Sequence, residues 1–339
     1  MRFRKKLHIY IEFEEKMIRY LAVDPSSQQI IGKDVLIFDA QIVTEGKITN
    51  PSLVESRLKI LMNERKWRGA KTSVVLPEDS VIVREEQVPG QLTESEVKDY
   101  LALHMNQLIR SPFKQTSFHF EVLEPGEATQ TILLLMYSSE VIHQYQELLE
   151  NVGLTPQVAD LSSLCLYRIL LHQQASELDE TSHRMVLQWH PTDNIMTVFH
   201  EHRPKFIRYS KASRLTELWD IDHEGRFIWT GETETVANAT EIRIDSLERF
   251  MDFYRYSVMN GEAGITEIYL TGTFPHLEQV EQRLNERFAL PIHRFSPVES
   301  LEEPYLTLYG LTMKEKKAPN RKKKKGKGRK SRCLKSIFL

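Results

Sequence analysis

The first forty residues alternate apolar and polar positions in three short runs. Residues 7–13, 17–23 and 34–38 each show the period of two that is typical of half-buried strands. Glu14, Glu15 and Lys16 separate the first two runs and form a short charged turn. We therefore expect a β-hairpin whose tip carries two carboxylates, followed by a third strand.

Helix signals follow this meander. Asn50 precedes Pro51, an arrangement typical of an N-cap followed by proline at the first helical position. Thr93 and Glu96 form a capping box in front of a helix whose apolar face we extend over Val97, Leu101, Met105 and Leu108. With Gly153 ending a later helix, residues 84–160 are predicted to form an inserted β-α-β-β-α-β subdomain.

The second half of the chain repeats the opening pattern. Residues 184–189 and 195–200 are strand-like and flank a tight turn at 190–193, and helix, strand and helix patterns follow. Two halves with one plan predict an α/β, actin-like (RNase H-like) two-lobed fold. The expected divisions are 1–83 for the first half of lobe 1, 84–160 for the insertion, 161–183 for a return helix and linker, 184–313 for a reduced lobe 2 and 314–339 for a tail.

Composition narrows the class of protein. Apolar residues make up 41% and charged residues 27% of the 339 positions, which is typical of a globular chain. No apolar run approaches the roughly 18 residues of a membrane span, and Glu12, Glu14 and Glu15 interrupt what would be the apolar part of a signal peptide. The two cysteines, Cys165 and Cys333, form no metal or disulfide pattern, so we expect a cytoplasmic protein.

The charge is unevenly distributed. Residues 314–339 contain 13 Lys or Arg and one acidic residue, whereas the rest has 32 basic and 46 acidic residues. Polybasic segments gain about 1 kcal/mol per cation at an anionic lipid surface, so we expect this tail to contact the membrane; an acidic protein partner or a solvated tail remain alternatives. The acidic body argues against nucleic acid. The expected membrane-contacting residues are Arg321, Lys322, Lys323, Lys324, Lys325, Arg329, Lys330 and Arg332.

Six segments in order resemble one protein family. They lie at 45–62, 80–113, 137–170, 246–257, 268–284 and 308–313, and include EGKITNPSLVESRLKILM, SLERFMDFYRYS, IYLTGTFPHLEQVEQRL and LYGLTM. Together they resemble PilM, the cytoplasmic actin-like protein of type IV pilus and competence-pilus assembly, which is related to the division protein FtsA. The resemblance covers roughly residues 7–313 and implies an actin-like fold with an inserted subdomain.

The resemblance also implies a partner and a function. A PilM-like chain is expected to act as a scaffold at the cytoplasmic face of the membrane and to dock the N-terminal segment of a PilN-like bitopic protein. Two alternatives remain: a nucleotide-gated actin-like ATPase in the same machinery, and an FtsA-like polymerising division protein tethered to the membrane. A homo-oligomer is compatible with each.

In the family, nucleotide lies between the lobes against two hairpin tips and an adenosine loop. The first tip resembles D-I-G-S-S, but Glu12 stands at the Asp position and Glu14 at the glycine. At about 4 Å, two like charges repel by about 4 kcal/mol with an effective dielectric of 20. Glu14 would therefore oppose a phosphate group, and Lys16 would offset part of this effect.

The other two elements differ from the family pattern as well. At the second tip, D-I-G-A-S is replaced by a sequence with Gln188 at the acid, His190 at the glycine and Pro191 after it. The adenosine loop S-G-G-G keeps only Gly272, and Phe274 would fill space that an adenine needs. We therefore expect a degenerate nucleotide site that binds ATP and Mg²⁺ weakly or not at all, with no catalytic residue, no cofactor and no metal site.

Overall fold

We describe a computed structural model of the chain, in which residues 7–105, 107–174, 179–212, 217–298 and 301–314 are placed. Residues 315–339 of the basic tail, with all the residues predicted to contact the membrane, lie outside this described part. No helix within the described ranges is both long and apolar enough to cross a bilayer.

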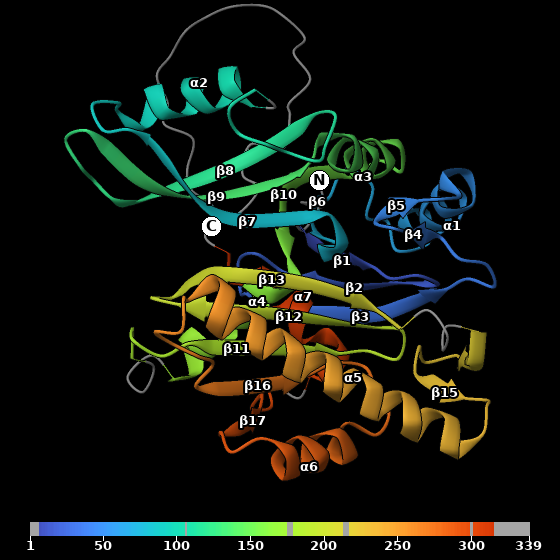
Figure 1. Ribbon diagram of the computed structural model, residues 1–339. Coiled ribbons are helices and arrows are strands. Elements are labelled where there is room, and N and C mark those ends of the chain that lie inside the picture. The colour runs from blue at the N-terminus through green and yellow to red at the C-terminus, as the bar shows by residue number, and fades with distance from the viewer. Residues whose placement is uncertain (1–6, 106, 175–178, 213–216, 299–300, 315–339) are drawn as a thin grey trace, which may run out of the picture.

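The first lobe is built on a five-stranded sheet in the order β10-β6-β1-β2-β3 (Figure 1). β1 and β2 form the predicted hairpin, and β6 and β10 run parallel to β1. The strands are β1 (His8–Phe13), β2 (Met17–Val23), β3 (Ile30–Ile37), β6 (Lys71–Leu76) and β10 (Thr155–Leu161). The short pair β4 (Val43–Thr44) and β5 (Lys47–Ile48) leads into α1 (Pro51–Glu64), and α3 (Ser139–Asn151) and α4 (Ser162–Gln174) complete this part.

The second lobe repeats this plan in a sheet of order β13-β12-β11-β16-β17. Its strands are β11 (Arg184–Trp189), β12 (Asp193–His200), β13 (Arg203–Lys211), β16 (Glu267–Thr271) and β17 (Ile292–Arg294). Helices α5 (Thr233–Phe253) and α6 (Leu277–Arg287) cover one face, and α5 passes in front of the sheet in Figure 1. The only sheet between β13 and α5 in the described residues is a two-stranded one, formed by β14 (Trp219–Ile221) and β15 (Phe227–Trp229).

The local helix signals form as predicted. The Asn50 side chain accepts a hydrogen bond from the Leu53 N–H at 3.2 Å, and Glu96 closes the capping box on the Thr93 N–H at 2.8 Å. Gly153, with φ +84°, follows the end of α3. The apolar face of α2 (Glu94–His104) was predicted too long, because the helix ends before Met105, and the Leu108 side chain is 68% exposed.

The insertion has the predicted order of elements, but its last two elements do not stand apart. β7 (Val81–Pro89), α2, β8 (Thr116–Glu124) and β9 (Thr129–Ser138) form a layer above the lobes, which we call the inserted sheet (Figure 1). β10 instead pairs with β6, and α3 packs its Tyr145 and Leu148 into the core of lobe 1. The predicted range 84–160 is therefore corrected to 81–138 for the separate layer.

The end of the second lobe was also placed too late. The helix α7 (Leu306–Thr312), although it follows lobe 2 in the chain, buries Leu308 and Leu311 against Tyr10 and Cys165 of lobe 1. Gly310 lets it lie against α4, because a Cβ there would be 2.1 Å from the Cys165 carbonyl oxygen. The predicted range 184–313 therefore includes a helix that belongs to lobe 1.

Candidate functional site

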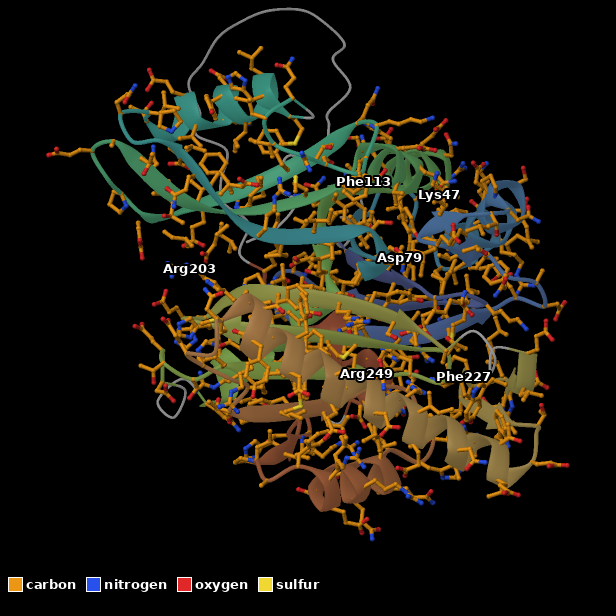
Figure 2. The ribbon with its side chains drawn as sticks, viewed as in Figure 1. Lys47, Asp79, Phe113, Arg203, Phe227 and Arg249 are labelled. Atoms are coloured by element: carbon orange, nitrogen blue, oxygen red, sulfur yellow. The ribbon has the colours of Figure 1, made fainter. Side chains whose placement is uncertain are left out.

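The two lobes enclose a cleft of about 650 Å³, and all five residues predicted at the nucleotide site line it: Glu12, Glu14, Gln188, His190 and Gly272. They come together because equivalent strands of the two sheets end at the cleft: Glu12 pairs with Val75 on β6, and Gln188 pairs with Thr271 on β16. Figure 2 labels three further lining residues, Lys47, Asp79 and Phe227, which come from β5, the 3₁₀ turn Glu78–Ser80 and β15.

Both carboxylates of the first hairpin tip are ion-paired. The Glu14 Oε1 atom lies 2.7 Å from Nε of Arg19, whose side chain is only 2% exposed. The Glu15 Oε1 atom lies 2.8 Å from Nζ of Lys211, at the end of β13 in the other lobe. The cation that pairs with Glu14 is Arg19 on the neighbouring strand, while Lys16 lines the same cleft.

The floor of the cleft holds carboxyl groups that favour the protonated form. Burial, and then the charge of Glu14, raise the pKa of Glu12 well above its ordinary value. Burial also raises the pKa of Glu78 to about 7, against the hydrogen bonds that it accepts from the Ser162 hydroxyl and the Ser163 N–H. A metal-bound phosphate needs ionised oxygen ligands beside it, and burial disfavours ionisation of these two groups.

Gln188 belongs to the same buried network. Its side-chain amide lies 2.8 Å from the Ser162 hydroxyl and 3.1 Å from the Ser163 hydroxyl, at the start of α4. Thr197 donates to the Ser163 hydroxyl at 2.7 Å. The amide that replaces the family's acid is thus bonded to the return helix and fixes the second hairpin to lobe 1.

The second hairpin tip is closed by its own side chains. The ring atom Nδ1 of His190 lies 2.9 Å from the Thr273 hydroxyl, and burial lowers the pKa of this histidine to about 4. A neutral ring with Nδ1 as acceptor therefore bridges the tip and the loop after β16. From α5, Arg243 donates to the carbonyls of His190 and Asp193, each at 2.7 Å.

Gly272 is required by backbone packing. Its φ is +142°, and a Cβ there would lie 2.1 Å from the carbonyl oxygen of Trp189. Phe274, two residues on, is 6% exposed and packs edge-on against Trp219 in the core of lobe 2. Both residues therefore have structural roles that do not involve a nucleotide.

One backbone N–H at each tip already has a partner within its own turn. The backbone N–H of Glu14 already bonds the Met17 carbonyl, and the N–H of His190 bonds the Asp193 carbonyl, both at 2.9 Å. Lysines at 16, 47 and 211 line the cleft, together with more numerous acidic side chains: Glu12, Glu14, Glu15, Glu45, Glu78, Asp79, Asp193 and Glu303. The surroundings are suited to neutral or cationic groups better than to a polyphosphate.

Sequence reasoning missed three cations at this site, namely Arg19, Lys211 and Arg243. Arg19 lies inside the apolar strand MIRYLAV, and a lone cation in such a strand indicates a buried partner. Arg243 interrupts an apolar helix face, which is a weaker indication of a buried cation. Lys211 gave none, because a lysine at a strand end is ordinarily solvated.

Comparisons with known proteins agree with this architecture. A family model described as type IV pilus assembly protein PilM matches residues 25–212. The solved structure of a PilM-PilN type IV pilus biogenesis complex superposes with a TM-score of 0.71 and 16% identity, over 91% of this chain and 98% of that chain. At this identity the likeness shows the fold, and the predicted actin-like fold is confirmed.

More distant structures were also found. A Bacteroides thetaiotaomicron protein with an actin-like ATPase fold has a TM-score of 0.46 and 14% identity, over 92% of this chain and 97% of that chain. The cytoplasmic domain of EpsL, from the type II secretion system of Vibrio cholerae, has a TM-score of 0.44 and 13% identity, over 91% and 96%. No curated protein matches the chain.

The match to the family model covers more than half of the 339 residues, and three of the ordered segments noted in the sequence, at 246–257, 268–284 and 308–313, lie beyond its C-terminal end. The chain belongs to the PilM family of type IV pilus assembly proteins.

Proposed function

We propose that this protein is a docking platform of a type IV pilus or competence pseudopilus. It holds the N-terminal segment of a PilN-like bitopic protein at the cytoplasmic face of the membrane. The observation that carries the proposal is the family match over residues 25–212, and the superposition on a chain of a PilM-PilN type IV pilus biogenesis complex supports it. The protein acts by binding, without catalysing a reaction.

The inserted sheet is the surface that we propose for the partner. It adds its own core, which includes Val97, Leu101 and Leu134, to an otherwise duplicated fold. An element added to one half alone is suited to a specific partner, because the duplicated fold has no counterpart of it in the described residues of the other half.

The cleft serves as a structural joint in this proposal and binds nucleotide weakly or not at all. Glu14 and Glu15 occupy the first tip, and His190 fills the space between the second tip and the loop after β16. The second candidate is a nucleotide-gated ATPase, which the retained cleft of about 650 Å³ favours. That candidate requires Mg·ATP to stabilise the folded chain.

We propose further that the tail, residues 315–339, brings the platform to anionic lipid. Its charge argues for this role, and Lys314 fixes its starting point: Nζ of Lys314 lies 3.2 Å from the buried carboxylate of Asp160. Sedimentation with vesicles of anionic lipid should pellet the full chain and leave residues 1–314 in solution. Equal sedimentation of both chains would refute the role of the tail.

The docking proposal is tested with synthetic peptides that copy the N-terminal cytoplasmic segments of the bitopic proteins encoded with the pilus genes. We expect one peptide to bind the full chain with 1:1 stoichiometry in isothermal titration calorimetry, without nucleotide. A scrambled peptide of the same composition is the control. Absence of binding by every such peptide, with a correctly folded chain, would overturn the proposal.

A further inference from the structure

Strand β13 joins the second lobe to the inserted sheet and to the first hairpin tip of lobe 1. Its cationic side chains at positions 203, 205 and 211 each meet a carboxylate from β8, β7 or the β1–β2 turn. Figure 2 labels Arg203, which lies between the inserted sheet and the second lobe. The pairs are Arg203 with Glu121 at 3.0 Å, Lys205 with Glu85, and Lys211 with Glu15 at 2.8 Å.

Lys211 is the cation of this strand that reaches the cleft. Its side chain is 32% exposed and that of Glu15 is 22% exposed, so the pair is partly shielded from water. The hydrogen bond to Glu15 raises the pKa of Lys211, which keeps it charged at neutral pH. The pair joins the first hairpin tip directly to the other lobe.

A second bridge crosses the cleft nearby. Arg19 binds Glu14 within lobe 1, and its Nη2 donates to the carbonyl oxygen of Gly225 at 2.7 Å. Gly225 is the turn of the β14–β15 hairpin, has φ +75°, and approaches Val35 of β3 so closely that a Cβ would lie 3.0 Å from that side chain. The buried guanidinium therefore ties lobe 1 to the aromatic hairpin of lobe 2.

We propose that these contacts form an interlobe latch, in which Lys211–Glu15 and Arg19–Gly225 hold the cleft closed without any bridging ligand. In proteins that close by hinge motion, a ligand commonly supplies the contacts that span the two domains. Here the protein's own side chains supply them, at the tip where the family holds a phosphate. The latch concerns the resting state of the cleft and does not depend on which peptide the inserted sheet docks.

The test reverses one charge and then restores the pair. The variant Lys211→Glu places a second carboxylate beside Glu15, and we expect hydrogen exchange of backbone amides in 13–17 and 219–229 to rise by about tenfold. The double variant E15K/K211E should return exchange close to the wild-type rate, because the pair is re-formed with its charges swapped. Lys59→Glu, which disrupts a pair within α1, is the matched control and should leave both segments unchanged.

Exchange in the core strand β16 reports whether each variant is folded. Should Lys211→Glu fail to fold, the wild type in increasing sodium chloride gives the same test, since salt weakens a partly exposed pair. Unchanged exchange in the charge-reversed protein, or faster exchange that the double swap does not correct, would overturn the latch. Slower exchange on adding Mg·ATP to the wild type would also overturn it, because closure would then depend on a ligand. Failure of peptide docking alone would leave these results unaltered.

Discussion

At the scale of single residues, Gly272 shows why a matching motif position does not establish a retained ligand. It is the one residue kept from the family's adenosine loop, yet its φ of +142° and the nearby Trp189 carbonyl explain it through packing alone. The adjacent contact of His190 with Thr273 depends on the same close approach of the loop to β11.

We predict that Gly272→Ala destabilises the protein by on the order of 3 kcal/mol, through strain at a positive φ and a clash with Trp189. Gly69→Ala is the control, because Gly69 has φ +79° and a Cβ added there would meet no atom within 4 Å, so it isolates the backbone strain. The free energy of unfolding in urea should fall by about 1 kcal/mol for the control. Equal losses in the two variants would contradict the packing role.

Glu78 is predicted to make stability depend on pH. Its pKa of about 7 in the folded state lies above the usual value for a glutamate, so the folded state retains a proton that the unfolded chain releases. The contribution of Glu78 to the free energy of unfolding is therefore fully present below about pH 4. It is lost as pH rises through 7, and the loss is on the order of 3 kcal/mol. Glu78→Gln, which is neutral at every pH, should be more stable than the wild type at pH 8 and similar to it at pH 4.

The measurement is urea unfolding of both proteins between pH 4 and pH 8. Glu55→Gln provides a control of opposite sign, because the hydrogen bond from Lys59 lowers the pKa of Glu55. A wild type and a Glu78→Gln variant with parallel pH profiles would show that folding does not raise the pKa of Glu78.

At the scale of elements, the second hairpin depends on a helix far away in the chain. Arg243 of α5 donates to the carbonyls of the 190–193 turn and lies over the Trp189 ring, with its guanidinium carbon 4.2 Å from the ring centroid. Arg243 is 8% exposed, and burial lowers its pKa to about 9. The turn geometry is thus set by α5 as well as by its own sequence.

We predict that Arg243→Met destabilises the protein by about 2–4 kcal/mol, because two turn carbonyls lose a buried charged donor. Arg283→Met on α6 is the control: Arg283 is half exposed and pairs with Glu241, and such a pair contributes under about 1 kcal/mol. Urea unfolding gives both values. If the free energy of unfolding falls no more for Arg243→Met than for the control, Arg243 does not hold the 190–193 turn in place.

Elements with a local signal were predictable, and those fixed by tertiary contacts were not. The hairpins, the Asn50 cap and the Thr93 capping box were recognised because their information lies within a few residues. That β10 and α7 belong to lobe 1 was not predicted, because alternation and helical period do not indicate which sheet an element packs against. The early end of α2 was missed as well, because Leu108 continues the helical period while remaining exposed.

At the scale of the whole molecule, the duplicated strand plan made the cleft between the lobes predictable. The contacts across the cleft were not predictable, because their partners are far apart in the sequence. Two copies of one strand plan place Glu12 and Gln188 at equivalent strand ends, so the cleft followed from the sequence. The partners across it did not: Arg19 and Gly225 are 206 positions apart, and no periodicity links them. The sequence showed that the first hairpin tip carries Glu14 and Glu15, but it did not show that other side chains form ion pairs with them.

The ion pairs of Glu14 and Glu15 affect whether a phosphate group can enter the first hairpin tip. Because Glu14 and Glu15 are already paired, a phosphate entering the first tip must break the contacts with Arg19 and Lys211. We therefore predict that Mg·ATP at millimolar concentration shifts the melting temperature by less than about 1 °C, since a ligand far below its Kd contributes almost nothing to stability. Differential scanning fluorimetry measures this, with Mg²⁺ alone as the blank and Glu12→Ala as the matched variant. A rise of several degrees that disappears in Glu12→Ala would establish a working nucleotide site and would favour the nucleotide-gated alternative.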